Sequence, residues 1–354
     1  MQHKDTQVWQ LDARCPEPAV IDRAAAIIKA GGLVAFPTET VYGLGANGLD
    51  PAAVAGIYRA KGRPSDNPLI LHVADRAMAH RLSHRLPPAA ALLMETFWPG
   101  PLTLVVPRAG EIPRQVTGGL DTVALRMPDH PVALALIKAA GVPVAAPSAN
   151  RSGRPSPTTA RHVWADLQGR VDAILDGGPA GLGVESTVLD LTGPQPLILR
   201  PGGVTCEQLA RLLPDVALDP AALGEKTASC QAPRSPGMKY IHYAPAAPLI
   251  LFEGELPRVQ QAMQRRAAEL LAAGRRVGLL VSEETAAGWP GAAHLLTLGS
   301  RRNPARAAAL LFARLRRFDR LPVDIILAEG IPGRGLGLAV MNRLRRAASE
   351  IVRC

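Results

Sequence analysis

The sequence predicts an α/β protein of two domains, with a twisted mixed sheet in the first domain and a smaller, Rossmann-like α/β second domain. The chain has 354 residues, of which 47% are hydrophobic, and is therefore long enough to bury two cores. Strand and helix patterns alternate irregularly over residues 1–210, which favours a mixed sheet over a simple doubly wound one. A more regular strand–helix alternation over residues 246–354 predicts the second domain.

Apolar spacing and turn residues define the elements of the first domain. Residues 20–30 have helical spacing, and Gly31-Gly32 ends this helix before a buried strand at 33–36. Asp50-Pro51 supplies the N-cap and the first residue of the next helix. The other predicted strands are 69–73, 102–106, 122–125, 143–146, 171–175, 187–191 and 197–199, and the other predicted helices lie near 88–96, 131–140 and 158–168.

Residues 211–245 are rich in proline and lack a sustained apolar pattern, which predicts an interdomain linker. The pattern after this linker is that of a small α/β domain. Its predicted strands are 248–252, 276–281, 294–298 and 324–328, and its predicted helices lie near 256–273, 304–317 and 336–349.

Composition restricts the class of protein. The net charge of +10 suits polyanions such as nucleotides or RNA, although an arginine-rich composition on solvated helix faces explains it equally well. Cys15, Cys206, Cys230 and Cys354 lie far apart, so reduced thiols are expected rather than a disulfide framework or a zinc site. No apolar stretch approaches about 18 residues and the N-terminus is polar, which predicts a cytoplasmic protein without membrane contact.

Four polar clusters lie at strand ends or in loops, where functional sites are usually built. Residues 37–45 follow a buried strand, and their glycines can bring backbone close to a ligand; a tight turn with capping threonines is the alternative. Lys61 and Arg63 lie in a loop stiffened by Pro64 and Pro68. A rigid pair of cations suits a phosphate clamp, although a solvated basic turn has the same composition.

The other two clusters carry hydroxyls, amides and arginines. Ser148 and Asn150, in residues 146–153, can face one side and contact phosphate or base edges, although an ordinary Asx or Ser turn is the alternative. The fourth cluster combines Arg126 with residues 185–187 and 200–203. Arg126 and Arg200 each end a predicted strand, and one such arginine is either a member of a surface ion pair or a clamp for a carboxylate. Two of them, together with the two cations above, predict a pocket for several negative charges.

The sequence lacks the patterns of several other chemistries. No G-x-S-x-G elbow, H-E-x-x-H helix, zinc-deaminase motif or Walker A spacing is present. Cations, hydroxyls and amides suit phosphoryl or nucleotidyl transfer, where positioning and charge stabilisation dominate. In the second domain, residues 333–337 lack the G-x-G-x-x-G spacing, so a structural or regulatory role is expected there.

Taken together, the clusters resemble the YrdC/Sua5 family of threonylcarbamoyl-AMP synthases. Any one motif is weak, but six motifs in register over most of residues 20–205 are specific. They are 31–45 (GGLVAFPTETVYGLG), 61–72 (KGRPSDNPLILH), 97–105 (FWPGPLTLV), 123–128 (VALRMP), 146–153 (APSANRSG) and 185–203. Residues 235–245 (SPGMKYIHYAP) and 335–347 (GLGLAVMNRLRRA) resemble the linker and the second domain of the long, two-domain Sua5-type members.

The resemblance implies a YrdC-like catalytic domain at 1–210, a linker and lid at 211–245 and a Sua5-type domain at 246–354. It implies that the amine of L-threonine captures bicarbonate or CO2, and that the resulting carbamate attacks the α-phosphate of ATP. Pyrophosphate leaves, and Mg2+ is expected on the triphosphate. Threonylcarbamoyl-AMP would serve N6-threonylcarbamoyladenosine formation at tRNA position 37, so downstream tRNA threonylcarbamoyl-transfer proteins are expected partners, with at most weak RNA contact.

The resemblance also implies residue roles. Lys61 and Arg63 are expected to bind the ATP phosphates and to act in catalysis. The rest of the expected ATP-binding set is Asn67, Thr122, Ser148, Asn150, Ser156, Arg200 and the linker residue Tyr243, the last as a lid that excludes water. The expected threonine-binding set is Thr40, His72, Arg126, Ser186 and the backbone of Ala146. No protein ligand to a metal is expected, because the phosphates supply most ligands of Mg2+.

Two other functions compete with this one. An RNA-binding module without catalysis would also use the +10 charge, but only 4% of the residues are aromatic and base stacking would be poorly supplied. A different acyl-adenylate or carbamoyl-transfer enzyme is the second alternative, since related domains occur in hydrogenase-maturation carbamoyltransferases. Those proteins carry zinc-finger-like cysteine clusters, which the scattered cysteines here do not match.

Overall fold

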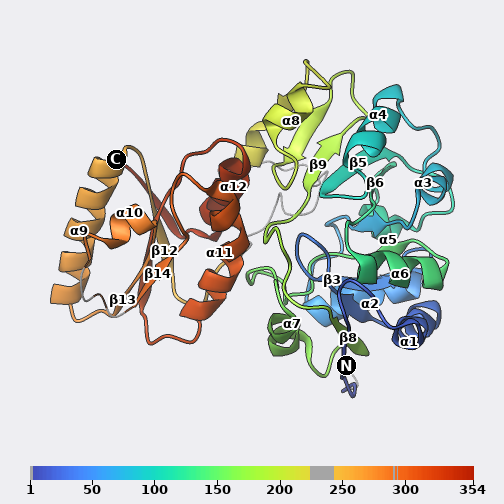
Figure 1. Cartoon of the computed structure of the whole chain (residues 1–354), viewed down its shortest axis with the longest axis horizontal. Helices are drawn as coiled ribbons and strands as arrows, with labels where there is room; N and C mark the ends of the chain where they lie inside the picture. The colour runs from blue at the N-terminus through green and yellow to red at the C-terminus, as the bar shows by residue number, and fades with distance from the viewer. Residues whose placement is uncertain (1–2, 224–242, 290–291, 293) are drawn as a thin grey trace. The chain divides into compact units, whose positions relative to one another are not determined.

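The computed structural model describes residues 3–289, 292 and 294–354 except for 224–242, and the chain divides into two compact units (Figure 1). The first unit comprises the described residues up to Ser152 and residues 156–222, and the second comprises 153–155, Leu223 and the described residues from Tyr243 onward. Residues 224–242 of the expected linker lie outside the described part of the chain.

The first unit contains an 11-stranded mixed sheet in the order β1-β8-β2-β3-β7-β4-β6-β5-β9-β10-β11. Its strands are β1 (Gln7–Gln10), β2 (Val34–Phe36), β3 (Gly43–Asn47), β4 (Ile70–His72), β5 (Leu102–Pro107), β6 (Thr122–Arg126), β7 (Val144–Ala145), β8 (Ala173–Asp176), β9 (Thr187–Asp190), β10 (Leu197–Arg200) and β11 (Ala217–Leu218). Its helices are α1 (Pro18–Lys29), α2 (Pro51–Lys61), α3 (Arg76–Leu82), α4 (Pro88–Phe97), α5 (Arg114–Thr117), α6 (Pro131–Ala140), α7 (Ala160–Leu167) and α8 (Cys206–Ala210), and the 3-10 helix η1 (Pro220–Leu223) follows them.

Strand direction decides where the polar clusters lie. β4 and β6 are parallel, with His72 opposite Arg126, and β7 is antiparallel to β4. β7 is also antiparallel to β3, which is itself antiparallel to β2. β4 and β6 therefore run opposite to β2. The loop after β2 begins at one edge of the sheet, and β4 and β6 end at the opposite edge.

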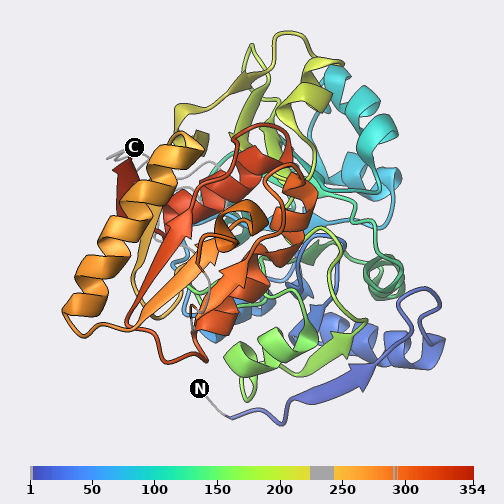
Figure 2. The same ribbon diagram turned by 60° about the vertical axis from the view of Figure 1, so that its left-hand side comes forward.

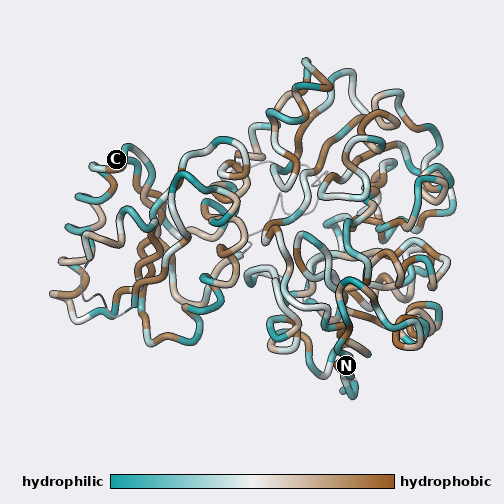
Figure 3. Tube along the Cα trace, viewed as in Figure 1, coloured by the Kyte–Doolittle hydropathy of each residue, from teal (hydrophilic) through white to brown (hydrophobic). Residues whose placement is uncertain are grey.

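Most strands of the first unit are buried, so the sheet forms the core of this unit. All three residues of β2 are buried, and α1 and α6 pack on each other beside the sheet. Figure 3 shows hydrophobic residues concentrated on the strands and on the inward faces of the helices in each unit. Phe36 has no exposed surface, and full burial of such a side chain stabilises the folded state by about 1.5–3 kcal/mol.

The second unit contains a five-stranded, all-parallel sheet in the order β14-β13-β15-β12-β16. Its elements are β12 (Leu249–Glu253), α9 (Leu256–Ala272), β13 (Val277–Val281), α10 (Glu283–Ala286), β14 (Leu295–Thr297), α11 (Pro304–Phe318), β15 (Ile325–Glu329), α12 (Leu336–Ala347) and β16 (Glu350–Arg353). Helices α9 and α10 cover one face of this sheet, and α11 and α12 cover the other (Figures 1 and 2). The predicted fold class is confirmed for both units.

The sequence patterns missed several strands. β3 has the sequence GLGAN and was expected to be part of a loop, because glycine is depleted in strands. Close packing explains the glycine at position 45, where a Cβ would lie 2.8 Å from side-chain carbons of Phe36 and Val144. β1 and β16 were also missed; both are short strands at an edge of their sheet.

The structure bears on two expectations drawn from composition. In the described ranges, no helix is long and apolar enough to cross a membrane. Cys15, Cys206 and Cys354 are free thiols, whereas Cys230 lies outside the described residues.

Candidate active site

Lys61 is the last residue of α2, and its side chain is buried. Gly62 ends the helix in the left-handed conformation, with φ at 64°, which glycine adopts without steric cost. The Lys61 ammonium donates hydrogen bonds to the carbonyl oxygens of Ser148 and Asn150, the second at 2.6 Å. The cation predicted to bind phosphate is therefore fixed on the segment predicted to complete the phosphate site.

Ser148 and Asn150 are also bonded to each other. Ser148 Oγ donates to Asn150 Oδ1 at 2.5 Å, and Asn150 Nδ2 donates to the carbonyl oxygen of Arg151 at 2.9 Å. The backbone of Ala149 donates to Tyr42 O at 2.8 Å, which ties this segment to the loop after β2. We call Lys61, Ser148 and Asn150 the lysine cluster.

The loop that follows Lys61 contains a buried amide without a partner. Arg63 Nη2 donates to the carbonyl oxygens of Asn67 and Pro68, at 3.3 and 3.1 Å. Asn67 has no exposed surface, and neither atom of its side-chain amide has a hydrogen-bond partner among the residues that the structure describes. Leaving a buried polar group unpaired costs about 1–3 kcal/mol, so the amide marks a place where a ligand can complete the hydrogen bonding.

Arg126 ends β6 as a buried cation with a carboxylate beside it. Its Nη2 lies 2.6 Å from Glu39 Oε2, and its Nε donates to the carbonyl oxygen of Gly100 at 3.2 Å. The contact with Glu39 is an ion pair without the alignment of a hydrogen bond, because neither Nη2 nor the Glu39 oxygens have a hydrogen-bond partner within the described ranges. Glu39 was absent from the predicted site residues, and we call it and Arg126 the arginine pair.

Arg200 contacts the segment that carries Ser186. Arg200 Nη2 donates to Ser186 O at 2.9 Å and to Ser186 Oγ at 3.1 Å, and Ser186 Oγ lies 2.8 Å from Thr103 Oγ1. Gly202 permits this approach, because a Cβ there would lie 2.3 Å from backbone atoms of residues 185–187. Arg200 was expected to support ATP binding, and here it contacts a residue that was expected to bind threonine.

Ser156 lies next to the same segment. Its hydroxyl is fully buried and donates to Glu185 Oε1 at 2.5 Å. Glu185 was part of a sequence motif but not of the predicted site. Two residues from the expected ATP-binding set, Ser156 and Arg200, thus adjoin the segment 185–186, so the two expected sets are continuous in space.

The loop 37–42 connects these groups. Thr38 Oγ1 donates to Val41 O and lies 2.7 Å from Thr40 Oγ1, so the buried Thr40 hydroxyl donates to Thr38. The backbone carbonyls of Glu39 and Thr40 accept hydrogen bonds from residues 182 and 183, at 2.8 and 3.1 Å. The loop therefore runs from the arginine pair to the lysine cluster, as the bond from Ala149 to Tyr42 requires.

Two expected site residues lie elsewhere in the chain's architecture. Thr122 begins β6, at the end of the strand opposite to Arg126. Tyr243 belongs to the second unit, where its ring lies 5.2 Å from that of Phe312. Its φ of 67° is rare for a residue other than glycine. A contact between Tyr243 and nucleotide stays a prediction.

His72 is a buried, neutral imidazole. Burial and, second, the positive charge of Arg126 lower the pKa of His72 to about 3. Its Nδ1 has no hydrogen-bond partner in the part of the chain that the structure describes, and its ring meets Phe36 edge-on at 6.2 Å. At neutral pH His72 can therefore form a hydrogen bond with a substrate without adding a charge beside Arg126.

The depressed pKa predicts a pH dependence of stability. Between pH 6.5 and about 3 the unfolded chain binds a proton at residue 72 that the folded chain does not. The free energy of unfolding therefore decreases as the pH falls through that window. We expect His72→Gln to reduce the loss of unfolding free energy between pH 7 and 5 by about 2 kcal/mol. Urea unfolding at both pH values measures it, and equal losses in the two proteins would contradict the assignment.

The donor set favours phosphate over a bare metal ion. Across the described ranges, no group of three or more His, Cys, Asp or Glu side chains could hold a metal. Lys61, Arg63, Ser148 and Asn150 instead present cations, a hydroxyl and an amide, which are the groups that bind phosphate oxygens.

Two family models match the chain. The Sua5/YciO/YrdC model, described as telomere recombination, matches residues 26–202. A second model, described as the C-terminal domain of threonylcarbamoyl-AMP synthase, matches residues 204–349.

Individual proteins are similar over nearly the whole length. The threonylcarbamoyl-AMP synthase of Bacillus subtilis (strain 168) is 51% identical over 329 residues, which are 93% of this chain and 92% of that protein. The threonylcarbamoyl-AMP synthase of Pyrococcus abyssi is 49% identical over 92% of this chain and 93% of that protein. The crystal structure of P. abyssi Sua5 complexed with L-threonine has a TM-score of 0.91 at 46% identity and covers 99% of both chains.

Proposed function

This chain belongs to the Sua5/YrdC family of threonylcarbamoyl-AMP synthases, and we propose that its first unit condenses L-threonine, bicarbonate or CO2 and ATP to threonylcarbamoyl-AMP, with release of pyrophosphate. In this reaction it acts as a nucleotidyltransferase. The observation that carries the proposal is the arrangement around β4. Ala146, next to the lysine cluster, donates to Ile70 at the start of the strand, and His72 at its end lies opposite Arg126. The contact toward the lysine cluster and the one toward Arg126 are thus made two residues apart on β4, or about 7 Å along that strand.

The arginine pair suits the carboxylate of threonine. An arginine fork binds a carboxylate through two parallel hydrogen bonds, and Glu39 already presents a carboxylate to Arg126. We propose that the substrate carboxylate takes over this pairing. His72, neutral and opposite Arg126 in the strand register, would then bond the threonine hydroxyl or the carbamate.

The lysine cluster and the loop after it suit the triphosphate. As the carbamate oxygen approaches the α-phosphorus, negative charge increases on the leaving pyrophosphate, and fixed cations stabilise it. Lys61 supplies a point charge, Arg63 a fork, and Asn67 an amide whose two atoms have no partner in the described chain. These residues orient the phosphates and stabilise charge, and the mechanism needs no covalent intermediate with the protein.

The bonds balance without an added oxidant or reductant. The threonine nitrogen bonds to the carbon of CO2 and loses a proton, which gives the carbamate. A carbamate oxygen then bonds to the α-phosphorus, and the bond from that phosphorus to the bridging oxygen breaks, so the electron pair leaves with pyrophosphate. We propose that Mg2+ arrives with ATP, held mainly by the phosphates.

The chemistry of the product indicates which reaction must follow this one. Threonylcarbamoyl-AMP is a mixed anhydride that water hydrolyses, so we propose that it passes to proteins that form N6-threonylcarbamoyladenosine at position 37 of tRNA. A Tyr243 lid that excludes water is part of this proposal. The positive charge of the chain supports at most weak contact with RNA.

A pyrophosphate-release assay tests the function. We expect purified protein to release pyrophosphate only when L-threonine, bicarbonate, ATP and Mg2+ are all present, because the carbamate is the nucleophile. Omission of each component in turn is the control. Release without threonine, or none in the complete mixture, would contradict the proposal, and release with serine at a reduced rate would agree with it, since one methyl group is worth only about 1–3 kcal/mol.

A further inference from the structure

The second unit has a pocket at the carboxyl ends of its parallel strands. Its volume is about 420 Å³, within the range of about 300–1,000 Å³ that is usual for small-molecule sites. The residues that line it follow four different strands. They are Leu256, Glu284, Arg301, Arg302, Pro304, Pro332 and Arg334.

The topology favours a ligand at this position. The chain leaves β13 toward β14 on one side of the sheet, and it leaves β15 toward β16 on the other side. β13 and β15 are neighbours, so the connections after them diverge and leave a crevice between their carboxyl ends. Open parallel α/β sheets bind ligands at such a switch point.

Arg301 is held rigidly at this crevice. Its Nη1 pairs with Glu329 and donates to Gly330 O at 2.7 Å. Glu329, the last residue of β15, has no exposed surface and also accepts hydrogen bonds from the backbone and side chain of Ser282, each at 3.0 Å. The contacts that the structure gives for the Arg301 side chain use Nη1 alone, so in the described chain Nε and Nη2 remain available as donors.

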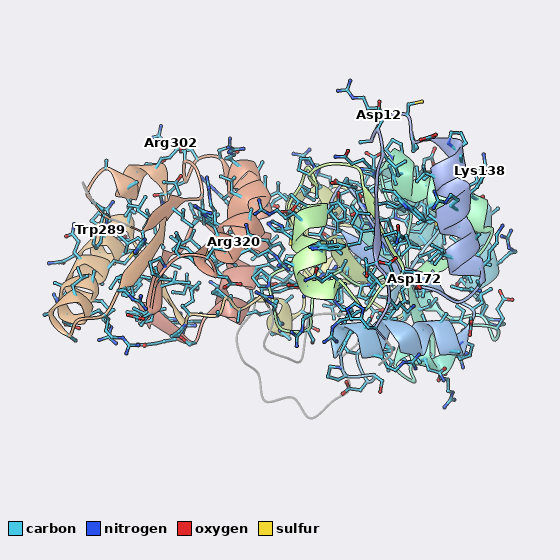
Figure 4. The ribbon with its side chains drawn as sticks, turned by 90° about the horizontal axis from the view of Figure 1, so that it is seen from below. Asp12, Lys138, Asp172, Trp289, Arg302 and Arg320 are labelled. Carbon is cyan, nitrogen blue, oxygen red and sulfur yellow. The ribbon has the colours of Figure 1, made fainter. Side chains whose placement is uncertain are left out.

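Two further guanidinium groups line the pocket with no competing partner. Arg302 and Arg334 are exposed, and their side chains form no hydrogen bond or ion pair with any residue that the structure describes. Figure 4 shows Arg302 at the surface of this unit. Glu284, the acidic residue of the lining, is engaged by Ser300 Oγ at 2.6 Å and by the backbone of Arg301 at 3.0 Å. Three guanidinium groups against two engaged carboxylates, Glu284 and the Glu329 that pairs with Arg301, leave the pocket positive.

From this geometry we infer a second anion site, which binds a small phosphate-bearing molecule between Arg301, Arg302 and Arg334. A rigid fork with two exposed partners fits phosphate oxygens, which accept several charge-assisted hydrogen bonds at once. Residues 333–337 lack the glycine pattern of a dinucleotide-binding loop. Arg334, within this segment, instead supplies a positive charge to the pocket. A free diphosphate and an adenine nucleotide share this chemistry, and the site lies wholly within the second unit.

Calorimetric titration of the full chain with pyrophosphate, and separately with AMP, tests the site. We expect the double variant Arg302→Gln/Arg334→Gln to bind at least one of these probes about tenfold or more weakly, because it removes charge-assisted hydrogen bonds to the phosphate oxygens. Binding in the first unit remains in both proteins and forms a common background. A loss with pyrophosphate alone identifies a diphosphate site, and a loss with AMP identifies a nucleotide site.

Arg265→Gln provides the matched control, because Arg265 is also an exposed arginine of the second unit but lies on α9 outside the pocket. It should leave both titrations unchanged. Both substituted residues are exposed, so thermal unfolding should show the double variant folded as the parent protein is. Superimposable titrations of the parent and the double variant with both probes would overturn the inference, whatever the outcome of the pyrophosphate-release assay.

Discussion

Replacing Lys61 by methionine is expected to lower the rate constant for threonine-dependent pyrophosphate release by about a hundred- to a thousandfold, the loss typical for removal of one preorganised charge-stabilising group. Methionine keeps an unbranched side chain of similar length, so the buried stem still packs at the end of α2. The ammonium is lost, together with its bonds to the carbonyl oxygens of Ser148 and Asn150. Single-turnover measurement at saturating ATP reports the chemical step directly.

The control for this variant is Lys138→Met. Lys138 is an exposed lysine of α6 in the same unit, labelled in Figure 4, and its substitution removes the same charge from the molecule. We expect it to retain full activity, since a solvated charge far from substrate is screened. Urea unfolding of Lys61→Met separates loss of the fold from loss of catalysis. Full activity in a folded Lys61→Met protein would remove Lys61 from the site.

The lysine cluster could be predicted from the sequence because its members lie in local motifs. Lys61 follows an apolar helical pattern, and Ser148 and Asn150 follow a strand of small residues, so composition alone places each at the end of an element. The buried amide of Asn67 was expected near ATP, but its lack of a partner is a property of packing that no local pattern contains.

Only one member of the arginine pair could be predicted from the sequence. Arg126 ends a recognisable strand, whereas Glu39 is one of several polar residues in a loop that precedes it by 87 positions. β6 runs opposite to β2, so the loop after β2 and the end of β6 start from opposite edges of the sheet, and no local pattern indicates that Glu39 and Arg126 meet. The sheet order was not predictable, because the strand between the loop and β7 is the glycine-rich β3, which has no strand signal.

The pocket of the second unit illustrates the same limit. Its strands and helices follow clear apolar periodicity, and the sequence predicted most of them. Arg301, Arg302 and Arg334 are indistinguishable in sequence from the other arginines of an arginine-rich chain. Only the hydrogen bond from Arg301 to Gly330 shows that the loops after β14 and β15 meet, and only the buried Glu329 shows that Arg301 is fixed there.

Replacing Arg126 by glutamine is expected to raise the KM for L-threonine by about a hundredfold or more, because two charge-assisted hydrogen bonds to the substrate carboxylate contribute about 1.5–3 kcal/mol each. The dissociation constant for ATP should change by less than about threefold, since the lysine cluster and its carbonyl partners are untouched. Steady-state kinetics with varied threonine, and equilibrium binding of a non-hydrolysable ATP analogue, measure the two effects separately. Equal losses of both would contradict the assigned role.

The variant needs a second substitution to be interpretable, because it leaves the Glu39 carboxylate, which is 18% exposed, without its counter-charge. Part of any loss could then come from a displaced loop 37–42, which also carries the buried Thr40. The double variant Arg126→Gln/Glu39→Gln removes both charges and should restore the stability lost in the single variant, which urea unfolding measures. If Arg126 binds the substrate carboxylate, the KM for threonine stays high in the double variant. If Arg126 serves only to hold Glu39 and its loop, the KM returns toward that of the parent protein, and this result would assign the arginine a structural role.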